Sequence, residues 1–294
     1  MFHSGYVAIV GVPNVGKSTL LNALLGEKLS IVTDKPQTTR HRILGILNRP
    51  KAQLLFLDTP GIHTTDKLLN ETIVDTAMQA MGDADIILHL VSPKPNLSET
   101  DQKIAARAKE MGKPHIVAIN KVDLVTKESL LPLIQRIQEE WAPEEIIPVS
   151  ALNRDGLEVI VKALVSRLPE GPAYYPTDIY TEHDLRFLSA EIVREKAMDL
   201  LYQELPYSLA TQTEAFDESG KIPHINVALI VEKDSQKGIV IGAKGSMIKR
   251  IGELARPDIE AMVGKKVFLE LFVKVVDDWS KSQHRLRELG ISNQ

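Results

Sequence analysis

Short apolar runs alternate with longer amphipathic stretches through the first 168 residues of the chain. Continuously apolar runs of this length are typical of parallel strands buried on both faces. They predict strands at residues 6–10, 54–57, 86–91, 116–119 and 146–149. The stretches between them predict helices at residues 19–25, 71–81, 101–111 and 128–140. The pattern therefore indicates an α/β domain with a mostly parallel sheet and helices on both faces.

The chain departs from this alternation in two places. Residues 30–42 form a polar loop that leads into a strand near 43–47, expected to pair antiparallel with 53–57. Residues 168–176 hold three prolines and one glycine, which is typical of a stiff interdomain linker. We therefore expect a first domain at 1–170, a linker at 171–182 and a second domain at 183–294.

The second domain has a different order of elements. Apolar residues at helical spacing predict a helix over 185–202, and strands are expected at 208–216, 224–231 and 267–276. Between the last two lies an apolar run at 239–241, followed by Gly242-Ala-Lys-Gly245. This order favours a smaller α+β domain.

Composition narrows the classes of function. The chain has 294 residues, 44% hydrophobic and 25% charged, as in ordinary globular proteins. It has no cysteine, which excludes disulfides, thiolate zinc sites and thiol catalysis. No apolar run approaches the roughly 20 residues of a membrane span, so the cytoplasm is the expected location. With a net charge of −4, any nucleic-acid site must be a local basic patch.

The segment Gly11-Val-Pro-Asn-Val-Gly-Lys-Ser18 follows the first predicted strand and opens the first predicted helix. That is the context in which G-x-x-x-x-G-K-[ST] binds phosphates, because the glycines let main-chain amides close around phosphate oxygens. Lys17 is expected to reach the β- and γ-phosphates, and the Ser18 hydroxyl to ligate Mg²⁺. The alternative is a glycine-rich turn before a buried helix. Further nucleotide contacts are expected from Gly11, Asn14, Val15, Gly16 and Thr19.

Two segments are expected to face the γ-phosphate. Asp58-Thr-Pro-Gly61 ends a predicted strand, where Asp58 could hold Mg²⁺ through water and the Gly61 N–H could contact the phosphate. In the 30–42 loop, Thr39 rather than Thr38 is the expected Mg²⁺ ligand. A solvent loop with incidental threonines is the alternative. The predicted catalytic set is Lys17, Thr39, Asp58 and Gly61.

The segment Asn120-Lys-Val-Asp123 follows the 116–119 strand and predicts selection of guanine. Asp123 could accept from the N1–H and 2-amino groups of guanine, whereas adenine offers neither donor. Asn120 is expected to bond the base edge and hold the phosphate loop, and the Lys121 stem to cover the ring. In Ser150-Ala-Leu152, the main-chain N–H of the central alanine, Ala151, could donate to guanine O6.

A second site is predicted around Gly242 and Gly245. Four cations lie in a window, 235–252, that contains no acidic residue. Glycines allow close approach of a nucleotide backbone, and an adjacent apolar groove can hold splayed bases. A structural turn between helices is the alternative. The expected RNA contacts are Lys237, Ile241, Gly242, Ala243, Lys244, Gly245, Lys249 and Arg250.

On these motifs and their order, residues 5–168 resemble a P-loop GTPase of the translation-factor-related class, and the remainder resembles a type II KH domain. Nearly the whole chain is similar to the Era-type GTPases of bacteria. The resemblance implies GTP hydrolysis with Mg²⁺, coupled to binding single-stranded RNA at the 3′ end of small-subunit (16S) ribosomal RNA during 30S subunit assembly. It also implies peripheral association with the inner membrane, and a monomer is expected.

The same resemblance bears on two individual residues. Ile62 stands where small GTPases place a glutamine that orients water, and an isoleucine cannot do so. Slow intrinsic hydrolysis is therefore the hypothesis. Asn14 resembles the asparagine that marks a potassium site in this class.

Two other functions stay open. One is a GTPase serving a different RNA task, and the other is a KH adaptor whose nucleotide is only structural. His89 is expected to be a core histidine, and 281–288 a solvated helix face.

Overall fold

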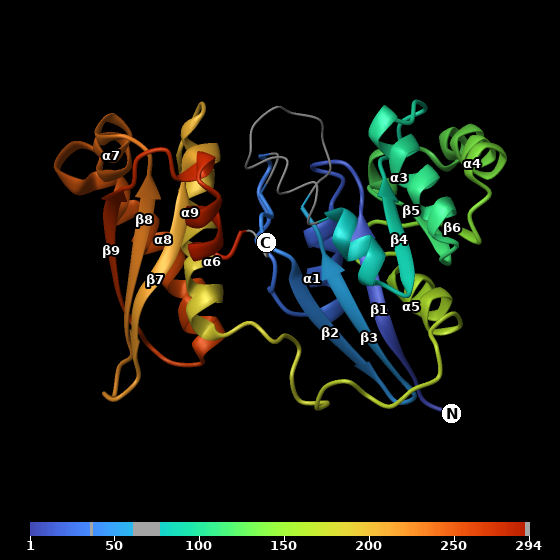
Figure 1. The fold of residues 1–294 in the computed structure, drawn as a ribbon, viewed down its shortest axis with the longest axis horizontal. Coiled ribbons are helices and arrows are strands. Elements are labelled where there is room, and N and C mark those ends of the chain that lie inside the picture. The colour runs from blue at the N-terminus through green and yellow to red at the C-terminus, as the bar shows by residue number, and fades with distance from the viewer. Residues whose placement is uncertain (36–37, 61–76, 292–294) are drawn as a thin grey trace. The chain divides into compact units, whose positions relative to one another are not determined.

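The computed structural model describes residues 1–35, 38–60 and 77–291, which form two compact units (Figure 1). The first unit holds residues 1–30 and most of the chain from Thr39 to Glu182. The second holds His183–Gln294 together with residues 31–38. Residues 171–182 thus group with the first unit, and the finer domain bounds stay a prediction.

The first unit is built on a six-stranded sheet of order β2-β3-β1-β4-β5-β6. Every neighbouring pair is parallel except β2 and β3, which are antiparallel with Leu47 opposite Leu54. The expected mostly parallel sheet and its antiparallel pair are confirmed. The strands are β1 (His3–Val10), β2 (Ile43–Arg49), β3 (Ala52–Asp58), β4 (Ile86–Val91), β5 (His115–Ile119) and β6 (Glu145–Pro148).

Helices cover both faces of this sheet, as the uninterrupted burial of β3 and β4 requires. On one face, residues 77–83 and α3 pack against Ala8 and Val10, and α4 packs against Val117 and Ile119. On the other face, α1 packs so closely that a Cβ at Gly45 would lie 2.7 Å from Leu21. The helices are α1 (Lys17–Leu25), α3 (Glu99–Met111), α4 (Lys127–Trp141) and α5 (Leu157–Val165).

The segment after α5 runs along the free edge of β2. The Ile46 N–H donates to the Tyr180 carbonyl at 2.8 Å, so the chain pairs with this edge strand. Gln53, buried in β3, accepts from the N–H groups of Tyr174 and Tyr175 at 2.7 and 3.0 Å. Because an unpaired sheet edge exposes main-chain groups, this packing covers it.

The second unit is a three-stranded sheet of order β7-β8-β9 backed by helices. β7 and β8 are antiparallel, whereas β8 and β9 are parallel. Helices α6 and α8 pack on the sheet around buried Val193, Ile251 and Ile259. The elements are α6 (Leu185–Leu200), β7 (Ala210–Asp217), β8 (His224–Val231), α7 (Asp234–Ile241), α8 (Ser246–Val263), β9 (Phe268–Val275) and α9 (Gln283–Glu288).

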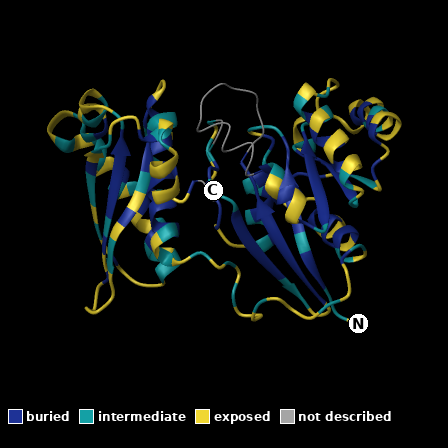
Figure 2. Cartoon of the chain, viewed as in Figure 1, coloured by how far each residue is buried: buried dark blue, intermediate teal, exposed yellow. Residues whose placement is uncertain are grey.

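This order confirms the expected smaller α+β domain, with one addition. Residues 234–241, which the hydrophobic pattern left unassigned, form helix α7 directly before the Gly242–Gly245 turn. Figure 2 shows that the strands of the first sheet and the central strand β8 of the second are largely buried, whereas β7, β9 and the outer faces of the helices carry exposed positions.

Candidate functional site

The phosphate loop joins β1 to α1 through three residues with left-handed backbone. Gly11, Asn14 and Gly16 have φ of 150°, 60° and 102°. At Gly16 only glycine fits, because a Cβ would lie 2.3 Å from the Asn120 side-chain nitrogen. The loop ends at the N-terminus of α1, whose first amides have no partner within the helix. Such a terminus is well suited to bind phosphate.

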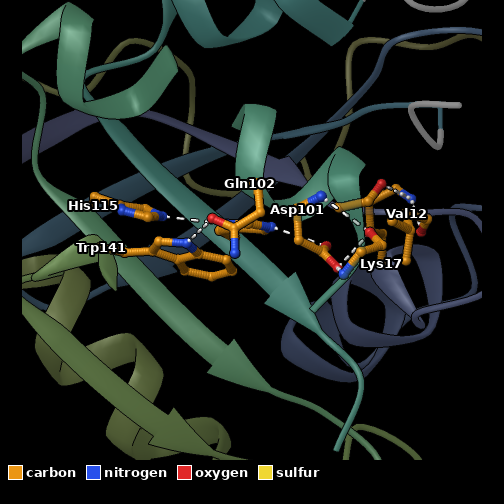
Figure 3. A network of polar contacts seen from close by, with 9 residues as sticks. Val12, Lys17, Asp101, Gln102, His115 and Trp141 are labelled. Atoms are coloured by element: carbon orange, nitrogen blue, oxygen red, sulfur yellow. Dashed lines mark hydrogen bonds and ion pairs between the residues drawn. The ribbon is translucent and has the colours of Figure 1, made fainter. Parts of the chain in front are cut away.

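Lys17 is folded back into this loop. Its ammonium donates to the Gly11 and Val12 carbonyls, both at 3.1 Å, and the residue is 6% exposed. Burial lowers the pKa of Lys17 to about 8, and the charges of Asp58 and Asp101 oppose that shift. Figure 3 shows Lys17 beside Val12. The geometry thus holds the Lys17 ammonium against two carbonyls of the loop, at the N-terminus of α1.

The three predicted magnesium ligands converge at the start of α1. The Ser18 hydroxyl donates to Asp58 Oδ2 at 2.8 Å and lies 2.9 Å from the Thr39 hydroxyl. Asp58 is fully buried, which raises its pKa, while the Ser18 hydrogen bond and the Lys17 charge lower it. Its other oxygen, Oδ1, is buried with no hydrogen-bond partner among the described residues.

This donor set fits Mg²⁺. Two hydroxyls and a carboxylate are hard oxygen ligands of the kind that Mg²⁺ prefers, and the unpaired Asp58 oxygen points to a missing cationic or hydrogen-bonding partner. Ser18, Thr39 and Asp58 are therefore the residues that would hold the ion. Bound there, it would neutralise charge on the β- and γ-phosphates.

Of the remaining residues expected near the γ-phosphate, the structure describes Thr38 but not Gly61. The Thr38 hydroxyl contacts the Thr33 hydroxyl at 2.8 Å and donates to the Lys35 carbonyl at 2.7 Å. The geometry therefore brings Thr39, not Thr38, to Ser18. Gly61 and Ile62 lie outside the described residues, so the roles expected of them stay predictions.

Asn120 ties the base-selection segment to the phosphate loop. Its side-chain nitrogen donates to the Val15 carbonyl at 2.9 Å, as expected for a residue that holds this loop. Its oxygen accepts from the Ala151 N–H at 3.0 Å. That N–H is the group expected to donate to guanine O6, so the structure gives it another partner and the guanine contact stays a prediction.

The other base-pocket candidates surround Asn120. Lys121 donates to the Asn14 carbonyl at 2.7 Å, so its side chain reaches back to the phosphate loop, and its expected role over the guanine ring stays a prediction. The Ser150 hydroxyl donates to Asp123 Oδ1 at 2.5 Å and orients that carboxylate. Leu152 is 76% exposed. Thr19 lies in the first turn of α1.

A buried histidine pair lies behind the phosphate loop (Figure 3). His89 is fully buried, as expected, with Asp101 at 3.4 Å and His115 at 3.4 Å from its two ring nitrogens. Trp141 stacks on His89 at 5.2 Å, and its indole N–H donates to Gln102 at 2.7 Å. Among the described residues no group of three or more His, Cys, Asp or Glu side chains could hold a metal ion.

In the second unit, the turn between α7 and α8 has the backbone expected of a nucleotide clamp. Gly242, Lys244 and Gly245 have φ of 74°, 51° and 78°. At Gly242 a Cβ would lie 2.8 Å from the Met247 nitrogen. Ala243 and Lys244 are exposed, and Gly245 precedes the first turn of α8. The clamp thus combines a tight glycine turn with a helix N-terminus.

A groove of about 420 Å³ lies beside this clamp, between α8 and β9. Its floor is apolar, from Ile248 on the helix and Leu269 and Leu271 on the strand. This is the apolar groove expected to hold splayed bases. The residues that line it are Ile248, Lys249, Gly252, Glu253, Arg256, Leu269 and Leu271.

Only Lys249 of the predicted RNA contacts lines the groove itself. Lys237 and Ile241 lie on α7, and Arg250 is exposed on α8, 3.6 Å from Glu253. The other residues that line the groove were not predicted from the sequence. A signal existed: positions 248, 252 and 256 share one helix face, and 269 and 271 share one strand face.

Two family models match the chain. One, described as a 50S ribosome-binding GTPase, matches residues 6–121, and a KH domain model matches residues 204–280. No helix among the described residues has the length and hydropathy to cross a bilayer.

Similar proteins extend the match to the whole chain. The GTPase Era of Syntrophus aciditrophicus is 48% identical over 99% of this chain and 95% of its own length. That of Geobacter metallireducens is 46% identical over 98% of each. A crystal structure of Era with MgGDPNP and nucleotides 1506–1542 of 16S ribosomal RNA is 42% identical, with a TM-score of 0.95 over 99% of this chain and all of that one. An Aquifex aeolicus Era variant bound to GDP·AlF4⁻ gives the same values.

Proposed function

The chain belongs to the Era family of GTPases, and from that premise we propose that it is a GTP-hydrolysing switch that binds the 3′ end of 16S ribosomal RNA. The observation that carries the proposal is the convergence of Thr39 with Ser18 and Asp58. Thr39 comes from a loop outside the phosphate-binding segment. A site that only stored a nucleotide would not need this third, γ-phosphate-dependent ligand.

In this proposal the first unit binds the nucleotide, positions its phosphates and neutralises their charge. The loop amides and Lys17 bind the phosphates, and Ser18, Thr39 and Asp58 hold Mg²⁺, which neutralises the charge of the triphosphate. Asp123, oriented by Ser150, selects guanine, because adenine would leave the carboxylate unpaired.

The second unit supplies the RNA-binding site. The Gly242–Gly245 turn lets the sugar-phosphate backbone approach the N-terminus of α8, and the apolar floor of Ile248, Leu269 and Leu271 takes unstacked bases. Lys244 and Lys249 contribute phosphate contacts from exposed positions. An Era relative crystallised with the 16S nucleotides supports this choice of RNA.

The family premise carries five further expectations. The protein would act on the 30S subunit during its assembly, in the cytoplasm and as a monomer. Potassium at Asn14 would stimulate turnover, and peripheral inner-membrane association stays a prediction from the family.

Two binding measurements test the proposal. We expect GTP to bind at least 100-fold more tightly than ATP, because the base edge of adenine cannot satisfy Asp123. We also expect a 16S 3′-end oligonucleotide to bind the parent and to lose most of its affinity in Gly242→Asp. Equal affinity for ATP, or RNA capture unchanged by that substitution, would refute the proposal.

A further inference from the structure

Asn22 binds the segment that leads into the Thr39 loop. It lies on α1 one helical turn after Ser18, so both side chains share a helix face. Its side-chain oxygen accepts from the N–H groups of Leu29 and Ser30, both at 2.9 Å. Its side-chain nitrogen donates to the Ser30 carbonyl at 2.7 Å. Three hydrogen bonds from one side chain thus fix the backbone of two consecutive residues.

One of the two residues fixed in this way, Ser30, has a side chain that is buried and unsatisfied within the described part of the chain. Ser30 is fully buried, and its hydroxyl has no hydrogen-bond partner among the described residues. Asn22 shares its helix face with Ser18, whose hydroxyl donates to Asp58 Oδ2 at 2.8 Å, so the fixed segment lies on the side of α1 that carries the magnesium ligands. Asp58 Oδ1 is a second buried oxygen without a partner among the described residues. A buried hydroxyl and a buried carboxylate oxygen therefore both remain to be satisfied.

We propose that Asn22 is a positioning residue for the magnesium end of the nucleotide site: it fixes Ser30 beside Asp58 and anchors the loop that carries Thr39. The inference rests on the proposed function, because it assigns a role within the same GTP site. Ser30, set by Asn22, supplies a hydroxyl to the surroundings of Asp58. Neither residue touches the nucleotide in this scheme, so neither is catalytic.

The proposal predicts a selective loss. Ser18 and the phosphate loop serve diphosphate and triphosphate alike, whereas Thr39 is the ligand expected to contribute mainly to triphosphate binding. When Asn22 is replaced, residues 29–30 lose their anchor, and the ordering of the loop must be driven by triphosphate binding. The affinity for a triphosphate should therefore fall, while the affinity for GDP stays nearly constant.

Asn22→Leu tests this in the full-length protein, because leucine keeps the size of the side chain and removes all three hydrogen bonds. Binding of fluorescent GDP and of fluorescent GDPNP is measured with Mg²⁺. We expect the GDPNP affinity to fall about tenfold and the GDP affinity to change less than twofold. Equal losses for both nucleotides, or no loss for either, would overturn the proposal.

A second variant, Ser30→Ala, keeps the test decisive if Asn22→Leu does not fold. Ser30→Ala removes one unpartnered buried hydroxyl, so a merely structural Ser30 predicts unchanged or higher stability with unchanged magnesium binding. We expect instead that the Mg²⁺ concentration for half-maximal GDPNP binding rises about fivefold. An unchanged magnesium requirement contradicts the role.

The matched control is Asn48→Leu. Asn48 also fixes a main-chain segment, since its side-chain nitrogen donates to the Thr177 carbonyl at 3.1 Å, but that segment is not the Thr39 loop. Its two nucleotide affinities should match the parent, and a selective GDPNP loss in this variant too would overturn the proposal. A parent that binds neither nucleotide would refute the proposed function itself, whereas normal parent binding without a selective loss in Asn22→Leu refutes only the role of Asn22.

Discussion

The buried histidines give the first unit a defined acid sensitivity. Burial lowers the pKa of His115 from 6.5 to about 3, and the neighbouring His89 adds to that shift. Because the folded pKa lies below the unfolded one, the unfolded chain binds the proton more readily. Stability is therefore fully present above pH 6.5 and is lost as the pH falls toward 3.

The size of the effect follows from linkage. A pH of 5.0 lies about 1.5 units below the pKa of His115 in the unfolded chain, so the unfolded histidine is protonated while the folded one stays neutral. This difference corresponds to about 2 kcal/mol of lost stability. At pH 7.5 both states are neutral, so the cost is close to zero. His115→Phe removes the titrating group but keeps a ring in place against Trp141, which lies 6.4 Å away.

Urea unfolding at pH 7.5 and 5.0 measures this difference. The chain has two tryptophans, and Trp279 lies in the second unit, so a Trp279→Phe background lets Trp141 report on the first unit alone. We expect the parent to lose about 2 kcal/mol more than His115→Phe between the two pH values. If both lose the same amount, protonation of His115 does not account for the acid sensitivity of the first unit.

Three further predictions concern the two sites. Gly16→Ala should weaken nucleotide binding at least 100-fold in a titration, because the new Cβ would meet the Asn120 side chain at 2.3 Å; near-parental affinity would contradict the loop geometry. Lys249→Ala should reduce the slope of log RNA affinity against log salt concentration by about 0.7, because one phosphate contact is lost. The control Lys109→Ala on α3 should leave the slope unchanged, and equal slopes in the parent and both variants would remove Lys249 from the interface. GTP turnover should be faster in potassium than in sodium, and identical rates would argue against an ion site at Asn14.

The hydrophobic pattern predicted the first unit closely because its information is local. Uninterrupted apolar strands such as Ile86–Val91 can lie only in a sheet covered on both faces, and each motif follows the end of such a strand. The convergence of Ser18 and Asp58 followed from that topology, whereas Thr39 lies in the loop before β2 and was predicted from the presence of a phosphate loop.

Helix α7 was missed because local propensity and tertiary context disagree. Its sequence contains Gly238 and β-branched residues, which favour other structures. Gln236 stabilises the start of this helix, because its side chain accepts from the Glu232 N–H at 2.8 Å and donates to the Ser208 hydroxyl at 3.0 Å. That second bond spans 28 residues, so no local signal reveals it.

The groove lining and the role of Asn22 were missed for the same reason. Leu269 and Leu271 meet α8 only because β9 pairs in parallel with β8, which sequence spacing does not specify. In the sequence, Asn22 looks like any polar residue on an amphipathic helix. Its partners become apparent only in the fold, where the chain after α1 turns back and the Leu29 N–H donates to the Asn22 side chain.

The central claim is that one chain couples a guanine-nucleotide site to an RNA site. The most direct test is the affinity of the full-length protein for a 16S 3′-end oligonucleotide, measured at one salt concentration with GDP and then with GDPNP. We predict tighter RNA binding with GDPNP, matched by an equal gain in GDPNP affinity when RNA is present. The same RNA affinity with both nucleotides would contradict the account.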